Sequence, residues 1–195
     1  MKVGEQREIL SRLVDRATAE LDRLISPLPV DDIYQKREVL MDVLPLLGET
    51  YGEAAAALAA DFYYLSREEA GVPGYFEPRV PPLPTADRWR TLSLWGTQSL
   101  IEGVGSDDLR TAAQNTLTRV SGGLKRSIFD QHRLTITDSS VADPQARGWR
   151  RVGDGKDCSF CRSLIAGGKI YTSPNVSFKS HDSCGCGAEM VWRDS

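Results

Sequence analysis

All four cysteines of the chain lie between positions 158 and 186, together with one of its two histidines. They form a C-x2-C pair followed by an H-x2-C-x-C group, made by five residues: Cys158, Cys161, His181, Cys184 and Cys186. Zinc takes four sulfur or nitrogen ligands at tetrahedral corners, and a C-x2-C turn can aim two thiolates at one point about 2.3 Å away. The spacing therefore predicts a Zn2+ site, and it requires the two ligand groups to fold back onto each other.

Two ligand sets fit this spacing. The simpler set repeats the two-residue gap and consists of Cys158, Cys161, His181 and Cys184. Residues two apart on an extended strand sit roughly 6–7 Å apart, whereas two thiolates on one zinc approach to about 3.8 Å. Cys184 and Cys186 can therefore both bind only if Gly185 folds the chain between them, which glycine permits. In that case the site is all-cysteine and His181 lies beside it.

Other interpretations of the cysteines are less favoured. Disulfides belong to oxidising compartments, but the first residues, MKVGEQREIL, lack the apolar segment of a secretion signal. A redox C-x-x-C needs a βαβ setting that the preceding sequence does not show. A catalytic zinc keeps one coordination position open. Because five donors are available, we expect a closed, structural site.

Charge is distributed unevenly along the chain. The net charge of −3 excludes a strong nucleic-acid bias of the whole molecule, but residues 1–70 carry fourteen acidic against eight basic residues. Residues 145–181 carry two acidic against seven basic residues, and the latter are Arg147, Arg150, Arg151, Lys156, Arg162, Lys169 and Lys179. These cations suit nucleic acid, but they also suit a zinc site whose thiolates leave it negatively charged.

The first 70 residues are predicted to be helical. Apolar residues recur every three or four positions through residues 5–25, and the Ser26–Pro29 segment ends that helix. Asp31 or Asp32 then caps a second helix, which Pro45 either kinks or ends before the alanine-rich run 54–60 resumes it. Residues 71–84 contain five prolines and predict an extended connector.

A second helical region is expected over residues 85–135. One helix begins at Thr85 or Asp87, and another is capped within 106–108 and runs to about His132. The Gly122-Gly123 pair within it predicts a bend, a close crossing or a break. His132 is expected at the surface or at the helix end.

The remaining chain, residues 145–195, is predicted to be a small zinc-binding module. We expect an extended link or strand at 134–137, strands at 149–152, 169–172 and 187–192, and one helical turn at 163–166. Because the module has few apolar residues of its own, metal binding is expected to contribute to its folding free energy. The fold class is therefore α+β, with a mainly α-helical N-terminal part and a small C-terminal, zinc-bound, β-rich module.

These motifs also resemble a known family. The GWRRV run, C-x-F-C, GGKIYTS and H-x-x-C-x-C segments are similar to the C-terminal part of phage Mu F-like minor head proteins of actinobacterial tailed phages and prophages. The DFYYLSREEAG stretch and the proline-rich connector are similar to the N-terminal part. The resemblance implies a head morphogenesis protein that is made in the host cytoplasm and packaged in the virion. It implies portal and capsid proteins as partners, with packaged DNA as a further partner during packaging or ejection, and no membrane.

Some members of that group are described as capsid maturation proteases. A protease of this kind needs a nucleophile and a base, and the only imidazoles are those of His132 and His181. The metal motif uses His181, which leaves His132 with Ser139 or Ser140. Deaminase, zincin and phosphate-loop motifs are absent from the sequence. We therefore expect a non-catalytic head protein recruited to the portal by its helices, with a capsid protease and a nucleic-acid-binding zinc ribbon as alternatives.

Overall fold

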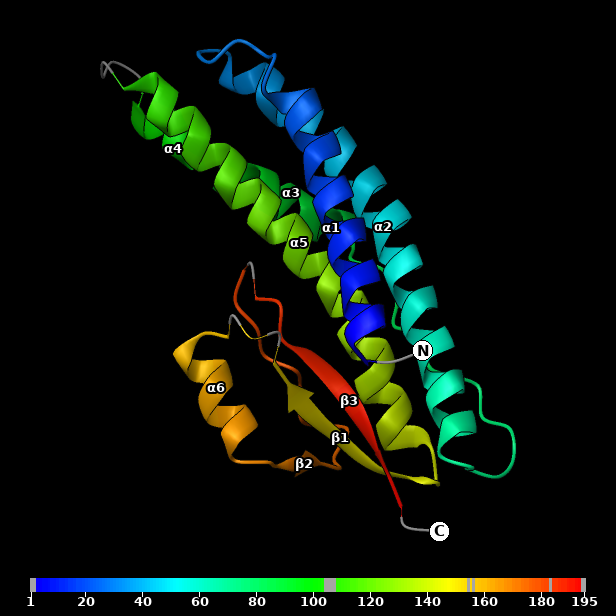
Figure 1. Ribbon diagram of the computed structural model, residues 1–195. Helices are drawn as coiled ribbons and strands as arrows, with labels where there is room; N and C mark the ends of the chain where they lie inside the picture. Colours follow the sequence, from blue (N-terminus) through cyan, green and yellow to red (C-terminus); the bar gives the residue numbers. More distant parts are fainter. Residues whose placement is uncertain (1–2, 104–107, 154, 156, 183, 194–195) are drawn as a thin grey trace.

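The computed structural model describes residues 3–103, 108–153, 155, 157–182 and 184–193. It has the expected α+β class, with long helices side by side and a small sheet packed at one end of them (Figure 1). The helices are α1 (Val3–Ile25), α2 (Ile33–Glu69), α3 (Ala86–Gly96), α4 (Gln98–Gly103), α5 (Leu109–Ala142) and α6 (Ser159–Ala166). The strands are β1 (Ala146–Val152), β2 (Ile170–Tyr171) and β3 (Gly187–Trp192).

Helices α1 and α2 form a hairpin, as the apolar spacing predicts. The stripe of Leu10, Val14, Ala17 and Leu21 is buried against α2 and α5. Asp32 caps α2 by accepting the N–H of Gln35 at 2.9 Å. Pro45 lies inside α2 and does not end it, because α2 continues to Glu69.

The glycine pair in α5 marks a close helix crossing. Helix α5 runs unbroken past it, and its N-cap is Asp108, whose carboxylate accepts the N–H of Thr111 at 3.3 Å. A Cβ atom at Gly123 would collide with the side chain of Leu92 on α3. Of the three interpretations of the pair, close approach is therefore the one that the structure confirms.

Two expectations for the end of α5 were wrong. Residues 134–137 are helical rather than extended, because α5 continues to Ala142. The hydroxyls of Thr135 and Ser140 donate to carbonyls one helical turn earlier, at 2.8 and 2.7 Å, and Ile136 is fully buried. Packing thus outweighs the strand propensity of these β-branched residues. His132 is likewise buried in the interior of α5, neither at the surface nor at a helix end.

The proline-rich connector runs along α5. The described part of residues 71–85 contains no helix or strand. The backbone N–H of Arg79 donates to the hydroxyl of Ser139 at 2.8 Å, and the side chain of Gln131 donates to the carbonyl of Pro82 at 3.1 Å. The connector is therefore held against the protein's own helix.

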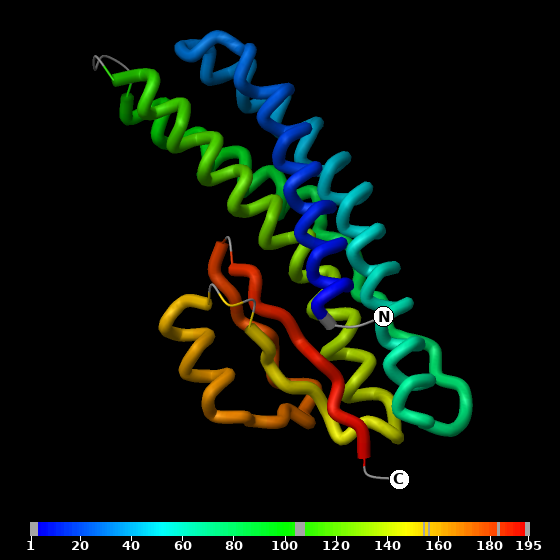
Figure 2. Tube along the Cα trace, in the orientation of Figure 1, coloured from blue at the N-terminus to red at the C-terminus, as the bar shows by residue number. Residues whose placement is uncertain are grey.

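The C-terminal sheet has the order β2-β1-β3 and is antiparallel. All three predicted strands are present, although β2 is shorter than expected and α6 is longer than the predicted turn. One face of the module packs on α5, and the N-terminal end of α1 lies close to β3 (Figure 2). The core of the module is not its own, because Ala59, Phe62, Tyr63 and Ile136 from the helices complete it.

The long helices carry no membrane signal. Within the described ranges, none of them combines the length and the apolarity needed to span a bilayer.

Candidate metal centre

Three cysteine sulfurs meet at the buried edge of the module. The Sγ atom of Cys161 lies 3.5 Å from that of Cys184 and 3.3 Å from that of Cys186, and the last two are 2.9 Å apart. These separations lie between a covalent S–S bond of about 2.05 Å and the spacing of about 3.8 Å between thiolates on one zinc. All four cysteines are free thiols. The three buried cysteines form a group that could hold a metal ion after a small expansion.

Local chain geometry explains how the sulfurs converge. Cys158 is the N-cap of α6, and its Sγ accepts the backbone N–H of Cys161 at 3.4 Å. The C-x2-C turn is thus the first turn of this helix. On the other side, the chain folds at Gly185, so that Cys184 and Cys186 both reach the group. The all-cysteine set requires this reversal of the chain at Gly185. The mixed set of Cys158, Cys161, His181 and Cys184 does not include Cys186.

Cys158 and His181 are the candidates for a fourth ligand. The backbone N–H of Cys161 and the side chain of His181 lower the pKa of Cys158 to about 7. Burial, by contrast, raises the pKa of Cys161. His181 is exposed, and its Nδ1 lies 2.8 Å from the carbonyl oxygen of Asp182. The structure therefore places His181 beside Cys158 and outside the group of three buried sulfurs.

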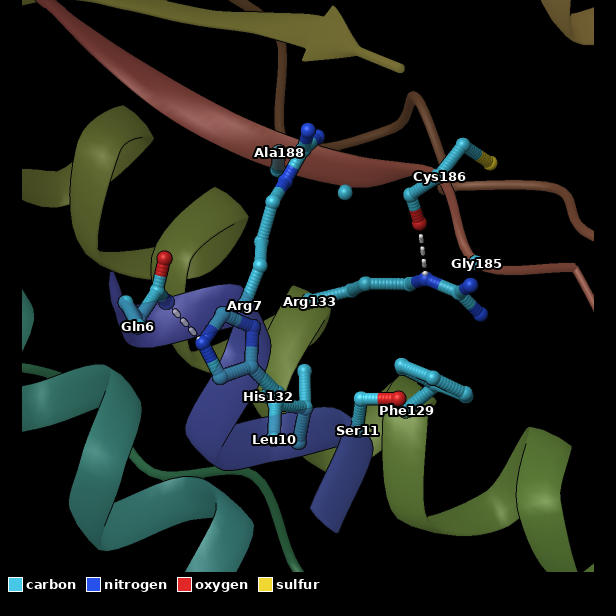
Figure 3. Close-up of a pocket in the computed structure, with 11 residues that line it drawn as sticks. Gln6, Arg7, Leu10, Ser11, Phe129, His132, Arg133, Gly185, Cys186 and Ala188 are labelled. Atoms are coloured by element: carbon cyan, nitrogen blue, oxygen red, sulfur yellow. Dashed lines mark hydrogen bonds between the residues drawn. The ribbon is translucent and has the colours of Figure 1, made fainter. Parts of the chain in front are cut away.

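Two buried arginines border the group. Arg151, on β1, places Nη1 3.0 Å from the sulfur of Cys186 and 3.7 Å from that of Cys161. Arg133, on α5, donates from Nε to the carbonyl of Cys186 at 2.8 Å (Figure 3). Its Nη2 donates to the carbonyl of Cys184. Sequence reasoning missed Arg133, since a single arginine in a helix carries no motif. For Arg151 it left two roles open, contact with nucleic acid and charge balance at the zinc site.

The other proposed nucleic-acid residues differ in their surroundings. Arg147 and Arg162 are exposed. Arg150 pairs with Glu189 at 2.7 Å, and Lys169 lies over the ring of Tyr171. Lys156 lies outside the described residues. Because Arg151 is buried and Arg150 is paired, less positive charge is free for phosphate groups than the sequence indicates.

His132 lines a small cavity of about 100 Å3 between α1, α5 and β3 (Figure 3). Burial lowers the pKa of His132 to about 3, so the ring is neutral, and its Nε2 meets the side-chain amide of Gln6. The hydroxyls of Ser139 and Ser140 contact Arg79 and the carbonyl of Ile136 instead. Among the described residues, neither serine is hydrogen-bonded to His132.

Comparison with known protein families gives a match over nearly the whole chain. No curated protein and no solved structure matches the chain. The model of the VG15 protein family matches residues 2–195, nearly the whole chain. The chain therefore belongs to the VG15 protein family, a family of phage proteins.

Proposed function

We propose that the protein is a non-catalytic minor head protein of a phage, associated with the portal and carrying a structural zinc site. The observation that supports this most is the position of the sulfur group. It is buried, it lies where the C-terminal module meets α5, and its flanking backbone is bound by a buried arginine of that helix. A buried site of this kind is typical of a structural metal rather than a catalytic one. The family and the resemblance to minor head proteins supply the virion context.

The donor set favours zinc. Thiolates are soft ligands, and zinc is commonly bound by four cysteines or by cysteines with histidine at closed structural sites. Cys161, Cys184 and Cys186 are all buried, so a water-filled open position is not provided on their side. The proposed role of the ion is to hold the β-rich module in one shape on the helices.

The portal contact is assigned to the end of the helical part that lies away from the sheet. Here the α1–α2 turn and α4 form the far end of the molecule (Figure 1). This end exposes large apolar side chains, with exposed fractions of 48% for Leu24, 80% for Tyr34 and 42% for Ile101. Exposed apolar side chains can contact another protein, and the proposal places that contact at this end of the molecule.

This proposal is tested by co-purification from assembling heads. Full-length protein should associate with portal or capsid protein, and a Leu24→Ser, Tyr34→Ser double variant should lose most of that association. Tyr75→Ser is the matched control, because Tyr75 is 79% exposed but lies in the connector next to the sheet end of α2. Equal loss with the control, or no loss with the double variant, would contradict the assigned surface.

The alternatives have less support. For a protease, the neutral and buried His132 has no hydrogen bond to Ser139 or Ser140. For a nucleic-acid-binding zinc ribbon, Arg151 faces sulfur and Arg150 faces Glu189. A capsid-cleaving activity of the purified chain that His132→Ala abolishes would favour the protease instead.

A further inference from the structure

Arg151 is a buried cation with an unusual set of partners. Its exposed fraction is 6%. Besides the two sulfurs, its Nη2 donates to the carbonyl of Lys179 at 2.8 Å, and its guanidinium carbon lies 3.8 Å from the ring centre of Phe178. No carboxylate is among the contacts of Arg151 in the described part of the chain. A buried charge is costly unless it is paired, and the guanidinium of Arg151 faces the sulfur group that would hold the metal.

Arg133 has a different set of partners. Asp130 supplies a counter-charge at 2.9 Å. The Nε and Nη2 groups remain for the carbonyls of Cys186 and Cys184, and the side chain is only 1% exposed. Arg133 therefore binds the backbone of the turn that carries two sulfurs, and it does so from α5.

We propose that Arg151 and Arg133 are positioning residues of the metal centre. Arg151 places its guanidinium against the sulfurs of Cys161 and Cys186, where it balances the negative charge of the metal-bound group, and Arg133 fixes the Cys184–Cys186 turn on α5. This inference rests on the metal centre of the proposed function. Groups that touch metal ligands from outside orient them and set the affinity for the ion.

Zinc binding and the packing of the C-terminal module on α5 should therefore be coupled. Zinc with four thiolates has a net charge of −2, and zinc with three thiolates and a neutral histidine has −1, so either complex balances Arg151 better than neutral thiols do. Arg133 reaches the ligand turn only when the module lies on α5. Because linkage is reciprocal, the packing of the C-terminal module on α5 should raise the affinity for zinc, and zinc binding should stabilise that packing.

The role of Arg151 is tested by zinc affinity in full-length protein, measured by competition with a chelator of known affinity. Arg151→Met should weaken zinc binding by about 10- to 100-fold, and Arg151→Lys, which keeps the charge, should recover part of the loss. Arg150→Met is the control, because Arg150 is the next residue of β1 but pairs with Glu189 at the surface. The cobalt-substituted variants should keep the sulfur-to-metal absorption of the wild type, since the ligands themselves are unchanged.

The role of Arg133 is tested by hydrogen exchange of residues 184–192. In zinc-loaded protein, Arg133→Met should raise the exchange rate of these amides at least about tenfold and should weaken zinc binding. Arg110→Met, at an exposed position near the N-terminal end of α5, is the control and should change neither by more than about twofold. If the wild type binds no zinc, the metal centre itself is wrong. If the wild type binds zinc but Arg151→Met and Arg133→Met bind it equally tightly, the metal centre stands and this inference fails.

Discussion

The helical part and the C-terminal module are stabilised by different chemistry. Between the long helices, the core consists of apolar side chains such as Leu40, Leu44, Leu124 and Ile128, all fully buried. In the module, buried sulfurs and the guanidinium of Arg151 occupy comparable positions. Apolar burial involves no metal, redox-active or ionisable group, whereas a thiolate centre depends on metal, redox state and acidity. The stability of the module should therefore depend on metal, redox state and pH more than the stability of the helical part does.

The dependence runs mainly in one direction. The helices have an apolar cluster of their own, but the cluster of the module needs side chains from α2 and α5. Further links fasten the module to the end of α2: the indole N–H of Trp192 donates to Ser66 at 3.1 Å, and Tyr63 stacks edge-on against Trp192. Loss of the module should leave most of the helical part folded, but loss of the helices should unfold the module.

The largest effect is expected from Cys161→Ser. Each of the three buried sulfurs contacts the other two, and Cys161 is the one that α6 contributes, so its removal should abolish stoichiometric zinc binding and release the module. Helical circular dichroism should fall only slightly, because α6 alone among the helices lies in the module. Metal content and dichroism measure the two regions separately. Ser163→Ala, at an exposed position of α6, is the control, and full zinc retention by Cys161→Ser would refute the site.

The next largest effect on zinc binding is expected from removal of the fourth ligand. Cys158 has a lowered pKa and belongs to the C-x2-C turn, whereas His181 is exposed with its Nδ1 at the carbonyl of Asp182. We expect Cys158→Ser to lose stoichiometric zinc and His181→Ala to keep it, with less than about tenfold weaker affinity. Zinc titration of both variants checks this. The opposite pattern would make His181, and not Cys158, the fourth ligand beside Cys161, Cys184 and Cys186.

A third effect concerns the junction itself. Arg67 of α2 forms a buried ion pair with Asp143, which follows α5, and Tyr63 donates to the same carboxylate at 3.1 Å. Arg67→Met should lower the free energy of unfolding by about 3–5 kcal/mol, because it leaves a buried carboxylate unpaired. Arg12→Met removes the exposed pair with Glu8 and should cost at most about 1 kcal/mol. Urea denaturation of both variants measures the two losses in the free energy of unfolding. Equal losses would contradict the proposed importance of the buried ion pair.

The smallest effect is a pH dependence from His132. Its pKa is about 3 in the folded protein and near its ordinary value of 6.5 when unfolded. The unfolded state therefore binds the proton more readily, so the full stability is present above pH 6.5 and is lost as the pH falls toward 3. Replacing His132 by Gln should reduce the loss of stability between pH 7 and pH 4.5 by about 2–3 kcal/mol. Denaturation curves at both pH values test this, and metal loss on acidification affects both proteins alike.

The features that the sequence predicted correctly are local ones. Helices α1 and α2 follow from apolar periodicity, and the caps at Asp32 and Asp108 follow from side chains that accept backbone N–H groups. The convergence of Cys184 and Cys186 was one of two stated alternatives, because glycine at 185 made it sterically possible.

The missed features depend on distant neighbours. Residues 134–137 have strand propensity but are helical because Ile136 is buried between the helices and the module. His132 and Arg133 are polar residues in a helix, and only the tertiary fold places one in a cavity and the other on the ligand turn. Their burial could not be read from periodicity, which treats polar side chains as solvent-facing.

The most direct test of the account is the metal content of full-length protein purified under reducing conditions, followed by hydrogen exchange before and after chelation. We expect one zinc per chain, and we expect chelation to accelerate exchange across residues 146–192 far more than in the apolar core of α1, α2 and α5. A protein that holds no metal, or whose residues 146–192 exchange at the same rate with and without zinc, would contradict the proposed role of the cysteine group.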